Sequence, residues 1–336
     1  MTEKGPSQGD LRKKLASLQE ESTYWSNIIG TIQKSSSTKD IQPTTLEDPV
    51  NELVKVSKLL HNESTKMGLV FKAPLQSGPA YRQTEKFGET QILMVSIASQ
   101  LNSLQSREKL SNLFVDAVLS GIEKCLVLTS EISSEYQKLG ESSVNEHVED
   151  DTRLAPVAKL WEAIDGLKSV CEQGSPFLLK ETSNQSKRLI KDALEEFEEW
   201  IEDPSSFSGD PFGIDEADDE EEVIVDGKLL EKASYFRDKF KLIMLLLNPL
   251  SVKSYTFLTG QEIDKLANNQ RKLSYFVDEI VISLTMNQDS EESSALYQDL
   301  ETECGKLFEL VLRCCGNDDK KIKWFTVWKE KFDAKN

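Results

Sequence analysis

The sequence predicts an all-α protein in which a flexible acidic loop joins two bundles of long amphipathic helices. Apolar residues recur at spacings of three and four along almost the whole chain, alternating runs of Val, Ile and Thr are scarce, and no hairpin signal is convincing. The length of 336 residues suggests two domains, at about 150 residues per domain. A hydrophobic content of 38% beside a charged content of 29% indicates a packed core with solvated tails or loops.

Helical spacing predicts long helices on both sides of the acidic segment. Asp48-Pro49 and Ser175-Pro176 each combine a capping side chain with a proline suited to the first helical position. Ser106 is expected to cap another helix, and Pro249 is expected to end the first helix after the acidic segment. The predicted ranges are about 10–29, 48–71, 79–104, 106–139, 156–172, 175–201, 227–247, 261–286, 290–315 and 319–332.

The negative charge of the chain comes from one segment. The formal net charge is −18, and residues 192–226 hold 16 acidic side chains and no Lys or Arg. Removing these 16 from the 58 acidic residues leaves 42 against 40 Lys and Arg, so the remainder is almost neutral. Like charges at this density repel, and the segment has little apolar surface to offset the entropy of ordering, so we expect a flexible loop.

This loop sets the predicted domain organisation. Residues 1–9 are expected to form a disordered N-terminus and 10–202 an N-terminal helical bundle. Residues 203–227 are the predicted linker, and 228–336 the predicted C-terminal bundle. The sequence does not assign the first helix, about 10–29, to one bundle, and it could pack against either of them. Oligomeric state does not follow from the sequence.

Composition excludes several classes of partner and location. Binding to nucleic acid as the main ligand needs a basic face, which an acidic chain does not favour. The longest apolar run, 242–247, is far shorter than the ~20 residues of a membrane span, and we predict a buried central helix there. The polar amino terminus lacks the apolar core of a secretory signal, and five Cys without paired spacing suit a reducing compartment.

The sequence predicts no catalytic, cofactor or metal site. His61 and His147 are the only histidines, and no two Cys have the spacing of a zinc knuckle. Neither a nucleophile elbow nor a Gly-rich phosphate loop occurs. The carboxylates around Glu195 to Glu199 are interpreted as the solvated face of a helix, and the cysteines as core thiols. We therefore expect a protein that is not an enzyme.

A short apolar stretch interrupts the acidic segment and is the one candidate binding site. Phe212 and Ile214 stand among acids, and one interpretation is a linker with incidental apolar residues. The other is a linear motif: a partner with an apolar pocket and a basic rim would hold the two apolar side chains while the acids steer its approach. The candidate partner-binding residues are Phe212, Ile214, Asp215, Glu216, Asp218, Asp219 and Glu220.

Four stretches of the chain follow one another in a distinctive order: Asp48-Pro49-Val50 through Phe71 and Ala73-Pro74, Val157 through Leu167, Lys191 through Glu202, and Asp210-Pro211-Phe212-Gly213 with the acids that follow. Through these stretches the chain resembles the GCIP family, the cyclin-D-interacting or cyclin-D-binding proteins. None of these stretches is a catalytic signature, so the resemblance rests on their order and spacing.

The resemblance implies an all-α fold of two helical bundles, shared between cytoplasm and nucleus, with a non-enzymatic role. It implies binding to cyclin D and to helix-loop-helix transcription factors, and restraint of cell-cycle progression and transcription. A second hypothesis rests on the long amphipathic helices alone, which also suit a cytoskeletal or junctional scaffold in the style of vinculin. Co-sedimentation with filaments separates the two hypotheses.

Overall fold

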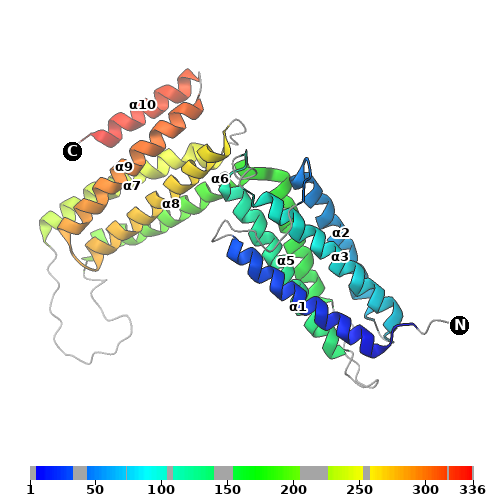
Figure 1. Ribbon diagram of the computed structural model, residues 1–336. Coiled ribbons are helices and arrows are strands. Elements are labelled where there is room, and N and C mark those ends of the chain that lie inside the picture. The colour runs from blue at the N-terminus through cyan, green and yellow to red at the C-terminus, as the bar shows by residue number, and fades with distance from the viewer. Residues whose placement is uncertain are drawn as a thin grey trace, which may run out of the picture. The chain divides into compact units, whose positions relative to one another are not determined.

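The computed structural model describes residues 5–32, 44–72, 74–103, 109–139, 154–204, 226–252, 258–315 and 318–334. Over these ranges the regular secondary structure is helical and contains no strand, which confirms the predicted all-α class (Figure 1). The chain divides into two compact units, Met1–Ser175 and Pro176–Asn336. No described helix is both long enough and sufficiently apolar to span a bilayer.

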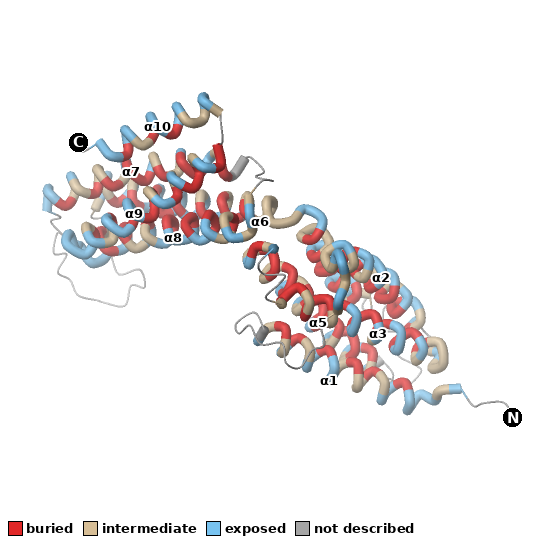
Figure 2. Tube along the Cα trace, turned by 45° about the horizontal axis from the view of Figure 1, so that its top comes forward, coloured by how far each residue is buried: buried red, intermediate tan, exposed pale blue. Residues whose placement is uncertain are grey.

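The first unit consists of α1 (Gln8–Ile32), α2 (Pro49–Val70), α3 (Ser77–Leu101), α5 (Asn112–Leu139) and the first part of α6 (Ala155–Glu202). Helix α1 packs against α5 and α3, and α2 packs against α3. Hydrogen bonds between the Thr23 and Ser130 hydroxyls (2.9 Å) and from the Gln137 amide to Gln19 (2.8 Å) show that α1 and α5 are antiparallel. The buried positions repeat at helical spacing, and the apolar stripes of the helices face the interior of the unit (Figure 2).

Helix starts in this unit follow their capping side chains. The Asp48 carboxylate accepts a hydrogen bond from the Asn51 backbone N–H at 3.0 Å, directly before Pro49, as predicted. Helix α5 begins after Ser111, whose hydroxyl accepts from the Phe114 N–H at 3.1 Å. The predicted cap, Ser106, lies outside the described residues. Helix α1 begins at Gln8, so residues 8 and 9, which were expected to belong to a disordered N-terminus, are helical.

A single glycine breaks α6 into the two helices that the sequence predicts. Gly174 has φ 70° and ψ −169°, a left-handed backbone conformation that favours glycine because a Cβ is disfavoured there. Pro176 follows two residues later and restarts the helix without needing a backbone N–H. The two units divide next to this break, between Ser175 and Pro176.

The second unit consists of residues 176–202 of α6 with α7 (Gly227–Val252), α8 (Gly260–Thr285), α9 (Ser290–Cys315) and α10 (Asp319–Asp333). Helix α8 packs against α9, and Thr259 and Glu262 form a reciprocal capping box at the start of α8. Helix α10 packs against α7, and the Trp328 indole N–H donates a hydrogen bond to the Leu242 carbonyl at 2.7 Å. The buried Lys239 ammonium donates to the Phe332 carbonyl at 2.6 Å.

Three further predictions differ from this architecture. The boundary was predicted at 203–227, whereas the units divide at Ser175–Pro176, because the break in α6 falls inside the expected N-terminal bundle. Pro249 does not end its helix: α7 continues to Val252. The run 242–247 is not buried on all sides, since Ile243 and Leu246 are fully buried but Leu245 is 46% exposed. The unallocated first helix, α1, packs within the first unit.

Candidate functional site

The residues that the sequence nominates for partner binding lie between two described helix ends. Helix α6 ends at Glu202 and α7 begins at Gly227. The nominated residues, Phe212, Ile214, Asp215, Glu216, Asp218, Asp219 and Glu220, all fall in 205–225, outside the described residues. Partner binding by these residues therefore stays a prediction.

The histidine that the structure describes has a packing role. His61 on α2 stacks against Trp161 on α6, with ring centroids 5.4 Å apart and planes 18° apart. The Trp161 indole N–H donates to the Ser64 hydroxyl at 3.0 Å, which fixes the ring against α2. His147 lies outside the described residues. Across the part of the chain that the structure describes, no three His, Cys, Asp or Glu side chains gather as metal ligands would.

The cysteines are core thiols. All five are buried, and none forms a disulfide. Burial raises the pKa of Cys125 and of Cys171 to about 12 and that of Cys314 to about 11, and it also raises the pKa of Cys304. Because the thiolate is the nucleophilic form of cysteine, these environments disfavour reaction at sulfur.

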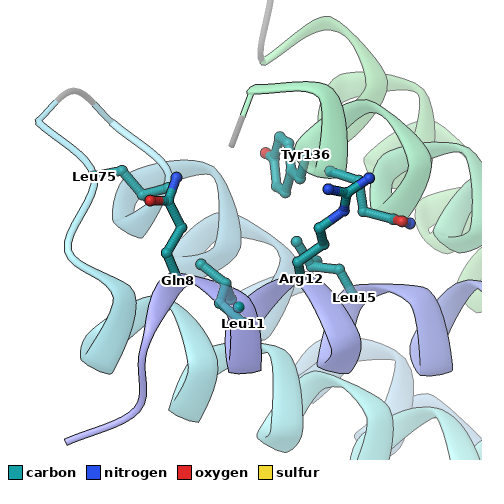
Figure 3. Close-up of a pocket in the computed structure, with 8 residues that line it drawn as sticks. Gln8, Leu11, Arg12, Leu15, Leu75 and Tyr136 are labelled. Carbon is teal, nitrogen blue, oxygen red and sulfur yellow. The ribbon is translucent and has the colours of Figure 1, made fainter. Parts of the chain in front are cut away.

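The first unit contains an open cavity at the end where α1 begins and α5 ends (Figure 3). Its volume is about 450 Å³. Apolar walls come from Leu11, Leu15, Leu75 and the ring of the buried Tyr136, and the exposed Arg12 stands at its edge. Tyr136 stacks on Phe71 at a centroid distance of 4.2 Å, so its ring is held as part of the core. The lining is mixed, because Gln8, Arg12 and Gln137 join the apolar residues, and it brings together no nucleophile with a base.

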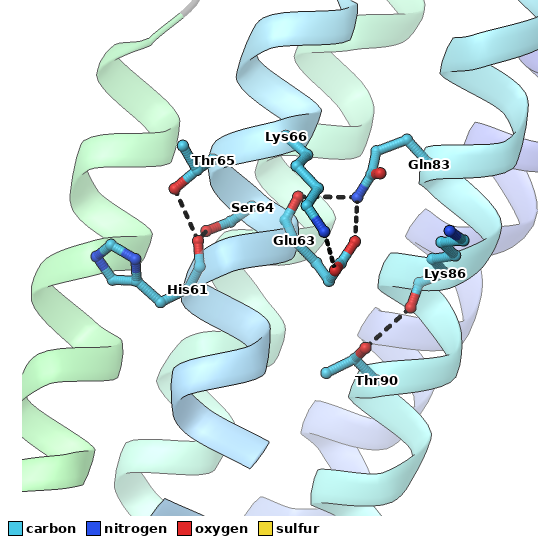
Figure 4. A network of polar contacts seen from close by, with 8 residues as sticks. All are labelled: His61, Glu63, Ser64, Thr65, Lys66, Gln83, Lys86 and Thr90. Atoms are coloured by element: carbon cyan, nitrogen blue, oxygen red, sulfur yellow. Dashed lines mark hydrogen bonds and ion pairs between the residues drawn. The ribbon is translucent and has the colours of Figure 1, made fainter. Parts of the chain in front are cut away.

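A buried carboxylate joins α2 to α3 (Figure 4). The Gln83 side-chain amide donates to Glu63 Oε2 at 2.6 Å and to the Glu63 carbonyl at 3.1 Å, while Lys66 Nζ lies 2.6 Å from Oε1. Burial alone raises the pKa of Glu63, but the hydrogen bonds from Lys66 and Gln83 outweigh burial and lower the pKa below its ordinary value. A carboxylate held ionised and already hydrogen-bonded is poorly suited to act as a general acid, so we assign it a structural role.

Sequence reasoning missed this buried carboxylate, although a signal was present. Glu63 follows Leu60 by three residues and precedes Met67 by four, and both neighbours are fully buried. The spacing therefore places Glu63 on the apolar stripe of α2, where an unpaired charge would be costly. A charged residue at such a position predicts a partner on the facing helix.

A second hollow lies on the outer surface between α1 and α3, and we call it the α1–α3 groove. Its lining residues are Glu20, Glu21, Tyr24, Trp25 and Ile92, and its volume is about 470 Å³. The side chains that line it combine an exposed aromatic and an exposed aliphatic residue with carboxylates: Tyr24 is 52% exposed and Ile92 is 47% exposed. Such a surface has the chemistry of a protein contact rather than of a catalytic centre.

Part of the chain matches a known family. Residues 52–203 match the family model described as Grap2 and cyclin-D-interacting, N-terminal. The resemblance to the GCIP family is confirmed over this segment. Of the four stretches that carry the resemblance, the one at 210–213 lies beyond the match.

Two fungal proteins are similar to this chain over most of its length. "Uncharacterized protein YLR287C" of Saccharomyces cerevisiae is 25% identical over 334 residues, covering 90% of each chain. "Uncharacterized protein C22E12.18" of Schizosaccharomyces pombe is 22% identical over 302 residues, covering 86% of this chain and 85% of the relative. Their printed names describe no activity, so the family description alone bears on function.

The GCIP-family segment maps unevenly onto the structure. It covers nearly all of α2 together with α3, α5 and α6, and it crosses the break at Gly174. Helix α1 lies outside it, although α1 is packed against α3 and α5. The α1–α3 groove therefore combines Ile92 from inside the GCIP-family segment with Tyr24 and Trp25 from outside it.

Proposed function

We propose that this protein is a non-enzymatic helical adaptor that binds cyclins of the D type or helix-loop-helix regulators, and that it restrains cell-cycle progression and transcription in cytoplasm and nucleus. The match of residues 52–203 to a cyclin-D-interacting family is the observation that carries the proposal. The buried thiols, the stacked His61 and the hydrogen-bonded Glu63 support a non-enzymatic role, because each has a packing partner rather than a reactive setting.

In this proposal the acidic segment contributes a contact. The acids around Phe212 and Ile214 would attract a partner with a basic rim, and the two apolar side chains would enter its pocket. Electrostatic attraction of this kind mainly accelerates association, and salt screens it over a Debye length of about 8 Å at physiological ionic strength.

A binding experiment with the intact chain tests the proposal. Purified full-length protein is immobilised and exposed to a purified D-type cyclin and, separately, to a helix-loop-helix domain. We expect saturable binding of at least one of them, and weaker binding when 205–225 is replaced by a Gly-Ser linker of equal length. A variant that carries amides in place of the acids of 215–222 separates loss of charge from loss of Phe212 and Ile214.

Two results would count against the proposal. Absence of binding to both regulators would remove the suggested partners. Co-sedimentation of the protein with actin filaments, in the absence of regulator binding, would favour the scaffold hypothesis instead. If regulator binding is intact in the linker variant, the adaptor function stands and the acidic segment has no part in it.

A further inference from the structure

The α1–α3 groove lies beside two polar contacts between parallel helices. Lys14 lies 3.7 Å from Glu85, and the Ser22 hydroxyl donates to the Gln91 amide oxygen at 2.9 Å. Residue numbers rise together along both helices, so α1 and α3 are parallel here. Beside these contacts, Tyr24 and Trp25 of α1 and Ile92 of α3 line an open hollow.

The floor of the groove is apolar and held in place. The Tyr24 and Trp25 rings contact edge to face, with centroids 4.8 Å apart, and this contact restricts both rings. Ile92 of α3 is 47% exposed and Tyr24 of α1 is 52% exposed, so the apolar floor is open to a partner. Large exposed apolar side chains that cluster around a hollow are typical of a surface that another protein covers.

Carboxylates surround this floor. Glu20 and Glu21 precede Tyr24 by one helical turn, and Glu89 precedes Ile92 by one turn, so these carboxylates share faces with the apolar residues. None of the three is ion-paired to a described residue, and Glu21 accepts only the Ser17 hydroxyl at 2.8 Å. The nearby Lys14 is engaged by Glu85. The groove is therefore an apolar hollow with an uncompensated negative rim.

We propose that the α1–α3 groove binds a basic amphipathic helix of a partner protein. Apolar anchors at helical spacing enter the hollow beside Tyr24 and Ile92, and Lys or Arg on the flanks of that helix pair with Glu20, Glu21 and Glu89. The same carboxylates repel nucleic acid, anionic lipid and the acidic segment of this chain. This inference rests on the proposed protein-binding function and adds to it a surface and the chemistry of the partner.

Fluorescence anisotropy with two labelled peptides tests the proposal on the full chain. The first probe is an amphipathic helix of Leu, Lys and Ala about 18 residues long, or five turns. The second has the same composition and charge, but its Leu residues are spread around the helix. Charge attracts both peptides equally to an acidic protein, but only the first presents its Leu residues on one face to the hollow. We therefore expect the second peptide to bind at least about tenfold more weakly than the first.

Matched variants locate the site. Ile92→Glu is expected to weaken binding of the amphipathic peptide at least about tenfold, since it places a charge in the hollow. Ile282→Glu is the control, because Ile282 is also exposed on a helix, at 41% against 47% for Ile92. It should leave the dissociation constant within about twofold. Replacing Glu20, Glu21 and Glu89 by Gln should weaken binding about three- to tenfold and flatten its salt dependence.

Several outcomes would overturn the proposal. One is equal binding of the two peptides, and another is unchanged binding to an Ile92→Glu protein whose circular dichroism and melting are normal. A third is self-association of the protein that Ile92→Glu abolishes, which would make a second copy the occupant. Peptide binding that behaves as expected in a protein that binds neither regulator would sustain the groove and refute the proposed function, so the two failures are distinguishable.

Discussion

The α2–α3 pair and the α8–α9 pair each contain a buried carboxylate that accepts from a side-chain amide of the facing helix and from a Lys three residues later. In the α2–α3 cluster, Glu63 accepts from the Gln83 amide and Lys66. In the α8–α9 cluster, Glu303 accepts from the Asn269 amide at 2.9 Å and from Lys306 at 2.8 Å. Each carboxylate lies three residues after a buried Leu, which is Leu60 for Glu63 and Leu300 for Glu303. Each also lies three residues before its Lys.

The two clusters differ in chain order and in positive charge. The carboxylate is on the earlier helix in the first unit and on the later helix in the second, so one is not a tandem copy of the other. Lys272 also pairs with Glu303, at 3.1 Å, and it follows Asn269 by three residues. Lys86 also follows Gln83 by three residues, but it lowers the pKa of Glu63 only through its positive charge and not through a hydrogen bond. The arrangement is thus a way to fix the register of antiparallel helices, and a buried carboxylate is no sign of catalysis here.

Removal of either carboxylate should have the largest effect. Glu303→Ala leaves the buried Asn269 amide without its carboxylate acceptor and two lysines without a counter-ion. We expect it to lower the free energy of opening the α8–α9 pair by about 2–3 kcal/mol. Glu63→Ala removes one ion pair instead of two, so it should lower the free energy of opening the α2–α3 pair by only about 1–2 kcal/mol. Hydrogen exchange measured by mass spectrometry reports each helix pair separately. Equal losses in both pairs would contradict the role assigned to Lys272.

Acid should weaken both clusters. Burial by itself raises the pKa of Glu303, but hydrogen bonds from Lys306 and Lys272 lower it below the ordinary value, as for Glu63. A carboxylate with a lowered folded-state pKa stabilises the fold above its unfolded pKa of about 4.3. That contribution is lost as pH falls through the lower, folded-state pKa. Urea unfolding from pH 7 downwards should show this loss, and Glu303→Gln with Glu63→Gln should reduce it; unchanged pH dependence in the double variant would refute the assignment.

The exposed lysines should matter least. Lys66→Met removes the ion pair of Glu63, and Lys306→Met leaves Lys272 beside Glu303. Both ammonium groups are more than half exposed, so we expect losses of only about 0.2–1 kcal/mol, smaller for Lys306 than for Lys66. Thermal melts in low and high salt measure the difference, which salt should reduce. A larger loss for Lys306→Met would mean that Lys272 does not compensate.

The helices were predictable because their signals are local. Asp48-Pro49 marks the start of α2, and the range 290–315 predicted from apolar spacing is the range of α9. The unit boundary was misplaced, because charge density marks the acidic segment strongly while the break depends on the backbone of Gly174. The α1–α3 groove was not foreseen, since Tyr24 and Ile92 come together only through long-range packing. Helical spacing identifies which face of a helix is apolar but not which part of it remains uncovered.

The break at Gly174 also bears on how this protein could be divided for study. The GCIP-family segment, 52–203, is a unit of sequence similarity but not a unit of folding. A fragment with these limits would lose α1, whose Leu15, Leu18 and Ile29 are buried in the first unit. It would also retain 176–202 of α6 without α7 to α10. The fragment that respects the packing instead spans Met1–Ser175, and it keeps both walls of the α1–α3 groove.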